Sequence, residues 1–75
     1  MTKYSIVLVP ADEGEYSVLI PALPGCFTQG ETRDEAVEMA KEAISLHLES
    51  LLAHGESVPT DNTELDTIEV EAPAA

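Results

Sequence analysis

Three segments near the start of the chain have the pattern of apolar and polar side chains that is typical of β-strands. Residues 3–9 are rich in β-branched side chains and apolar on both faces, which predicts a central strand. Residues 15–20 alternate and predict a second strand, while residues 26–29 predict a short third one that ends at Gly30. Because only residues 10–14 join the first two strands, we expect an antiparallel hairpin.

A helix is predicted directly after the third strand. Thr32 and Glu35 form a capping box, in which each side chain satisfies a free backbone N–H at the helix start. His54 and Gly55 supply the end signal. Between them, apolar residues form one stripe at helical spacing: Ala36, Val37, Ala40, Ala43, Ile44, Leu48 and Leu51. Two further apolar residues widen this stripe, so it packs either under the chain's own loops or against another copy.

Apolar and polar residues alternate again near the end of the chain. Residues 66–71 predict a final strand at the edge of the sheet, and a right-handed crossover would place it parallel to the third strand. The element order is therefore β-β-β-α-β, an α+β fold with one small, mostly antiparallel sheet packed against one helix. We expect residues 1–75 to form a single domain, with a core over 3–71 and a tail over 72–75.

The charge of the chain narrows the function classes. The chain contains fifteen acidic residues but only three Lys and Arg residues, which gives a net charge of −12. Because the phosphates of nucleic acids are also negatively charged, we expect no direct binding of nucleic acid by this chain alone. The charge fits either a basic protein partner or a surface adapted to solubility or high salt. The single cysteine cannot form a disulfide within the chain, and the sequence has no apolar run of about 20 residues and no signal peptide. We therefore expect a cytoplasmic protein.

No catalytic or metal-binding pattern is present in the sequence. The bend Pro24-Gly25-Cys26 places no cation or base beside the thiol, so we interpret Cys26 as a small, half-buried structural residue. His47 and His54 would lie about 10.5 Å apart along the helix, too far to share one ion. There is also no phosphate-binding glycine loop and no cysteine pair, and we expect no cofactor.

One set of motifs resembles a known family, the HicB-like antitoxins, over residues 3–70. The matching residues are Gly14-Glu15-Tyr16, Pro21-x-Leu23-Pro24-Gly25-Cys26-x-Thr28-x-Gly30-Glu31-Thr32, Glu35-Ala36 and Glu42-Ala43. The resemblance implies a partial ribonuclease-H-like fold, assembly into homodimers or homotetramers, and a partner of the HicA type, a small basic mRNA interferase. Many members continue into a DNA-binding segment. This sequence ends at Ala75 without one, so we expect no autorepression by this polypeptide alone.

The resemblance leads to one main hypothesis and two alternatives. The main hypothesis is an antitoxin that covers the RNA-binding surface of its toxin, and the candidate contact residues are the acids in two turns: Asp12, Glu13, Glu15 and Glu31. The first alternative, a metal-dependent nuclease, lacks the acid expected in the first strand, so we expect no enzyme activity. The second alternative is an orphan, non-catalytic module that binds a ligand or serves as a scaffold.

Overall fold

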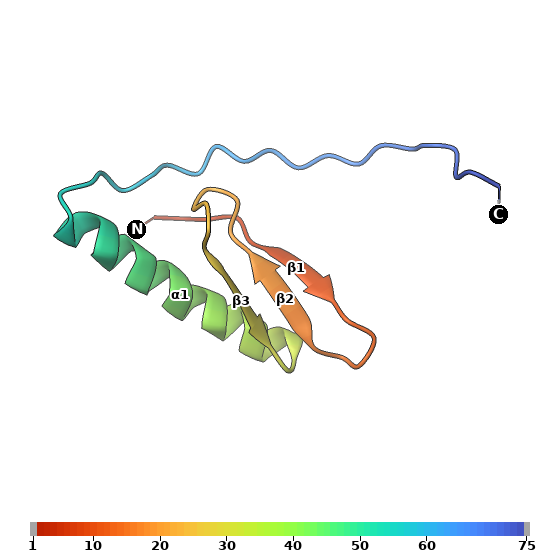
Figure 1. The fold of residues 1–75 in the computed structure, drawn as a ribbon, viewed down its shortest axis with the longest axis horizontal. Helices are drawn as coiled ribbons and strands as arrows, with labels where there is room; N and C mark the ends of the chain where they lie inside the picture. The colour runs from red at the N-terminus through yellow and green to blue at the C-terminus, as the bar shows by residue number, and fades with distance from the viewer. Residues whose placement is uncertain (1, 75) are drawn as a thin grey trace.

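The computed structural model describes residues 2–74, which form a three-stranded sheet followed by one helix (Figure 1). The strands are β1 (Val7–Pro10), β2 (Tyr16–Leu19) and β3 (Phe27–Gly30), and the helix is α1 (Arg33–Ala53). The strand order is β1-β2-β3, and both neighbouring pairs are antiparallel. This confirms the α+β fold class and the predicted hairpin.

The strand β1 differs from its prediction. It begins at Val7, four residues later than expected, and within the described residues it pairs only with β2. It is thus an edge strand, and the prediction of a central strand from its apolar composition was wrong. Apolar composition reports how the faces of a strand are buried, whereas strand pairing decides whether it is central or at an edge, and β1 has one neighbour. In addition, α1 covers only one face of the sheet. The apolar side chains on the other face stay partly exposed, including Val9 at 48% and Leu19 at 52%.

The predicted final strand is also not formed in this structure. Residues 66–71 pair with no strand among the described residues, and the parallel crossover is therefore absent from them. The chain leaves the end of α1, passes the segment that enters β1 and runs on past the sheet (Figure 1). Ile68 and Val70 are 83% and 79% exposed. Alternation shows which segment could form a strand, but a strand also needs a free edge within reach.

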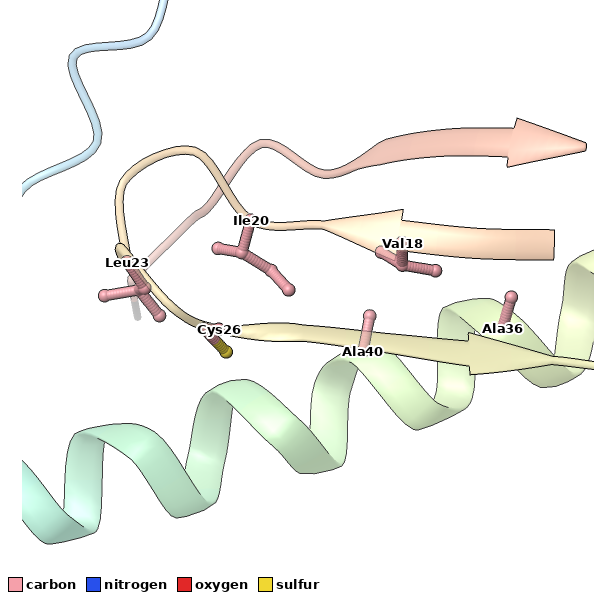
Figure 2. Packing of buried hydrophobic residues seen from close by; sticks show 6 residues of the cluster. All are labelled: Val18, Ile20, Leu23, Cys26, Ala36 and Ala40. Atoms are coloured by element: carbon pink, nitrogen blue, oxygen red, sulfur yellow. The ribbon is translucent and has the colours of Figure 1, made fainter.

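The core is small and lies between the inner face of the sheet and the first half of α1. It consists of Val18, Ile20, Leu23, Cys26, Ala36 and Ala40. Figure 2 shows the two alanines of α1 beneath the larger side chains of β2 and the bend that follows it. Because these two helix residues are small, the helix can approach the sheet closely.

Gly30 marks the closest approach of the strand β3 to the helix. A Cβ atom at this position would lie 2.4 Å from the backbone nitrogen of Ala36 and 2.7 Å from its Cα. Any side chain here would meet helix backbone, which is less able to move than a flexible side chain. Glycine at the end of β3 therefore allows the chain to turn directly into α1.

The bend between β2 and β3 brings Leu23 and Cys26 into the core. Leu23 N donates to the Ile20 carbonyl at 3.0 Å, and Cys26 N donates to the Leu23 carbonyl at 2.9 Å. Gly25 has a φ of +81°, a left-handed conformation that favours glycine. Pro24 is exposed on the outside of the bend. The bend is thus a series of tight turns whose inward-facing side chains close one end of the core.

Helix α1 begins at the predicted cap. The Glu35 backbone N–H donates to Oγ1 of Thr32 at 3.1 Å, and the Glu31 N–H donates to Oε1 of Glu35 at 3.2 Å. The helix ends at Ala53, with His54 as its C-cap, and Gly55 follows with a φ of +74°. Within residues 2–74, no helix combines the length and the apolar character needed to cross a membrane.

Candidate functional site

The β1–β2 turn carries two of the candidate acids at its tip. Ala11 N donates to the Glu15 carbonyl at 2.8 Å, and Gly14 N donates to the Ala11 carbonyl at 3.1 Å. Gly14 has a φ of +93°, which lets the chain reverse in so few residues. Asp12 and Glu13 occupy the exposed tip between these bonds. Their carboxylates therefore face solvent on a short, hydrogen-bonded turn.

The register of β2 and β3 brings the other two candidate acids together. Tyr16 pairs with Gly30, so one residue beyond this pair Glu15 comes opposite Glu31. Like charges in directly opposite positions repel each other and reduce the stability of a sheet. The structure thus places both residues at the corner where β3 turns into the helix, and both line the same hollow.

A third carboxylate completes an acidic hollow at this corner. The hollow has a volume of about 470 Å³, and the residues that line it include Glu15, Glu31, Glu35, Gln29 and Met39. From the sequence, Glu35 was assigned only to the helix cap. Its position three residues after Thr32 also puts it beside the corner, so the strand register together with the cap could have identified it as a site residue.

Within the part of the chain that the structure describes, the carboxylates of the hollow form no ion pair. Among residues 2–74 the one ion pair joins Nζ of Lys41 to Oε1 of Glu38 at 3.1 Å, on the exposed surface of the helix. The same residues contain no group of three or more His, Cys, Asp or Glu side chains arranged to hold a metal ion. The chemistry available to the hollow is therefore that of hydrogen-bond acceptors with uncompensated negative charge, which suits Lys or Arg of a partner.

An apolar patch borders the hollow on the outer face of the sheet. Leu19 pairs with Phe27, and their side chains are 52% and 71% exposed. Two residues along the strands, Ser17 pairs with Gln29, and both of these residues line the hollow. Since alternate residues of a strand share one face, Leu19 and Phe27 lie on the same face of the sheet as Ser17 and Gln29, two residues of the hollow's lining. This surface combines an apolar area with an acidic edge.

Cys26 is the remaining group with possible chemistry, and it is inaccessible. It is a free cysteine with 9% of its surface exposed. Burial raises the pKa of its thiol, which disfavours the reactive thiolate at neutral pH. The side chain lies with Ile20 and Leu23 over the helix (Figure 2).

Comparison with known proteins gives consistent results. A UPF0150 protein of Thermoplasma acidophilum is 48% identical over 66 residues, covering 88% of this chain and 96% of that protein. Antitoxin HicB of Escherichia coli K12 is 39% identical over 57 residues, covering 76% of this chain. Antitoxin HicB 1 of Photorhabdus laumondii is 40% identical over 57 residues. The matched regions make up only 41% and 37% of the lengths of these two antitoxins.

A solved structure has the same fold. The crystal structure of the N-terminal domain of Burkholderia pseudomallei antitoxin HicB matches with a TM-score of 0.73 and 38% identity, over 80% of this chain and 72% of that one. The model of the HicB_like antitoxins of bacterial toxin–antitoxin systems matches residues 4–74. The chain therefore belongs to the HicB-like antitoxin family.

Proposed function

We propose that this protein neutralises a small, basic, HicA-like mRNA interferase by covering its RNA-binding surface. The observation that carries the proposal is the acidic hollow, whose carboxylates have no cation of their own, in a member of an antitoxin family. A surface that binds RNA is rich in Lys and Arg. A protein with a net charge of −12 attracts such a surface at long range.

The acids of the hollow and the turn have different roles in this proposal. Glu15 and Glu31 lie together in the hollow and accept hydrogen bonds from cationic side chains of the toxin. Asp12 and Glu13 lie at the exposed tip, where charges mainly raise the association rate. The neighbouring apolar patch supplies contact area that slows dissociation.

The proposal includes no enzymatic step, and it places the protein in the cytoplasm, where an interferase meets mRNA. It also includes self-association into a homodimer or homotetramer. The support for self-association is the small core and the number of large apolar side chains left exposed on the sheet, the helix and the C-terminal segment.

The test is an RNA cleavage assay with the purified chain and a HicA-like toxin, to be sought as a short basic protein encoded in a neighbouring reading frame. We expect a stoichiometric amount of the chain to protect the RNA. The double variant Asp12→Lys and Glu13→Lys should lower the association rate about tenfold at low salt. Raising the salt from about 0.05 to 0.5 M shortens the Debye length from about 14 to about 4 Å, so the rates of the variant and the original protein should converge.

A matched control makes the same change in net charge at two exposed glutamates far from the hollow. Glu49 is exposed on α1, about 21 Å along the helix axis from Glu35, and Glu56 is exposed beyond the end of the helix. Glu49→Lys combined with Glu56→Lys should therefore change the association rate much less. If the chain neither binds the toxin nor protects the RNA, the antitoxin role is wrong. The alternative is then a non-catalytic module that binds another ligand. The structure offers two cavities for it: the hollow, and a more apolar groove of about 550 Å³ between the segment that enters β1 and α1, whose lining includes Tyr4, Ile6 and Ile44.

A further inference from the structure

The second cavity, which we call the apolar groove, lies between α1 and the segment that enters β1. Its volume is about 550 Å³, and its lining is mostly apolar: Tyr4, Ile6, Val37, Ala40, Ile44 and Leu48. Tyr4, Ile44 and Leu48 among them are half-buried and pack against the core. The floor of the groove is therefore the outer layer of the core, where apolar surface stays uncovered.

The apolar groove and the acidic hollow lie on opposite flanks of the helix. Ala36 and Ala40 are buried against the sheet, and a helix turns by about 100° per residue. Glu35 and Met39 of the hollow are then about 80–120° to one side of the alanines, and Lys41 of the groove is about 120° to the other side. A molecule in the groove therefore leaves the hollow free.

The charge in the apolar groove is opposite to that of the chain as a whole. Among residues 2–74, those that line the groove include no Asp or Glu, and the charged one is Lys41. The whole chain, by contrast, has fifteen acidic residues and three Lys and Arg residues. The groove thus offers a cation beside an apolar surface, which suits an apolar molecule with one negatively charged end.

Lys41 can exchange its partner within the protein for such a ligand. Nζ of Lys41 lies 3.1 Å from Oε1 of Glu38, and the two side chains are 69% and 70% exposed. An exposed pair of this kind contributes little, because both groups are well hydrated when they separate. A carboxylate attached to an apolar tail gains the burial of that tail in addition to the ion pair, so it can displace Glu38.

The wall of the groove opposite the helix is held in place by the C-terminal part of the chain. The Tyr4 hydroxyl donates to the carbonyl of Pro59 at 2.6 Å, and Ser5 N donates to Oδ2 of Asp61. These bonds fix the segment that enters β1, which lies outside the strand ladder. Because the wall is already ordered, a ligand does not have to order it on binding.

The length of the groove sets the length of the ligand. Nζ of Lys41 lies beside Glu38, and Leu48 is about 15 Å farther along the helix axis. Three bonds of an extended chain span about 3.5 Å, so an extended hydrocarbon advances about 1.2 Å per bond. A tail of about twelve carbons therefore reaches from the lysine to Leu48.

We propose that the apolar groove binds a free aliphatic monocarboxylate of about twelve carbons, with its carboxylate at Lys41 and its tail along Ile44 and Leu48. This binding is separate from the proposed neutralisation of a toxin, which uses the hollow on the other flank of α1.

The test is an NMR titration of the isotope-labelled full chain with octanoate, decanoate, dodecanoate and tetradecanoate. We expect saturable shifts of the Ile6, Lys41 and Ile44 amides, with little change at Gln29 and Glu31 in the hollow. Full burial of one CH₂ strengthens binding about fourfold, and an open groove covers one side of the tail, so affinity should rise about twofold per CH₂. The rise should stop at dodecanoate, because a longer tail passes Leu48.

Variants of the ion pair test the position of the carboxylate. Lys41→Gln should weaken decanoate binding about tenfold and leave the binding of decanol unchanged, because it removes a charge-assisted hydrogen bond. Glu38→Gln should strengthen decanoate binding about threefold, because Lys41 then has no partner to give up. Arg33→Gln is the matched control: it removes the same charge about 12 Å along the helix axis from Lys41, so it should have little effect.

Decylammonium separates binding in the groove from general adsorption. A chain with a net charge of −12 attracts this cation, so adsorption without a site for the charged end favours decylammonium over decanoate. We expect the opposite order at the amides of the groove. The proposal is overturned if decylammonium shifts these amides at the lower concentration, or if Lys41→Gln and Arg33→Gln weaken decanoate binding equally. It is also overturned if decanoate gives no saturable shift up to about 10 mM, in which case another occupant, such as a second copy of this chain, covers the groove. A failure to protect RNA from the toxin leaves these results unchanged.

Discussion

Replacing Gly30 by alanine tests the closest contact in the fold. The added methyl group would lie 2.4 Å from Ala36 N and 2.9 Å from the carbonyl carbon of Glu35. Ordinary contact requires about 3.5 Å, so the start of the helix must move by about 1 Å. Because the atoms it meets belong to the backbone, we expect a cost near the upper end of the usual overpacking range, about 3 kcal/mol.

The unfolded state offsets part of this cost. Alanine restricts the unfolded chain more than glycine does, which favours folding by about 0.5–1 kcal/mol. The net loss of unfolding free energy should thus be about 2 kcal/mol. For a domain of this size, that loss corresponds to a fall in Tm of about 8–16 °C. Urea unfolding followed by circular dichroism measures the free energy directly.

Gly25→Ala is the matched control. No atom lies within 4 Å of its added methyl group, so its expected cost of about 1 kcal/mol comes only from the positive φ. Hydrogen exchange separates the two mechanisms. The Ala36 amide, which donates to the Thr32 carbonyl at 2.9 Å, should lose protection in Gly30→Ala and keep it in Gly25→Ala. If Gly30→Ala costs less than about 0.5 kcal/mol and Ala36 stays protected, the reasoning about close approach is refuted.

Three further predictions concern the cap, the thiol and the attachment of the C-terminal arm, the extended residues 64–71, through the residues that precede it. Thr32→Ala should lower the unfolding free energy by about 1 kcal/mol in urea, with Thr32→Ser close to the original protein. Iodoacetamide should modify Cys26 slowly in the folded protein and rapidly in urea, because burial raises its pKa; fast modification without urea would contradict this. Hydrogen bonds from Thr63 and Ser5 hold the pKa of Asp61 well below its ordinary value near 3.9. The attachment should therefore be complete above about pH 4 and weaken progressively as the pH falls below it. The amide shifts of Ser5 and Thr63 should follow this change, and Asp61→Asn should abolish the pH dependence.

The secondary-structure elements that depend on interactions between residues close together in the sequence could be predicted from the sequence alone. The hairpin, the bend around Gly25 and the helix from Arg33 to Ala53 depend on hydrogen bonds between residues a few positions apart. The cap shows this most clearly, since Thr32 and Glu35 meet wherever the helix begins. The motifs in these same segments also identified the family, which the comparisons confirm.

The position of β1 and the state of the arm were decided only by the tertiary structure. Strand composition reports how apolar a segment is, but whether it is central or at an edge depends on which strands pair with it, and β1 has one partner. The alternation around Ile68 likewise cannot show whether another strand lies beside the segment, and within residues 2–74 none pairs with it. The hollow has the same origin: Glu15, Glu31 and Glu35 are separated along the chain and come together because the strand register and the glycine at position 30 bring β3 against the helix.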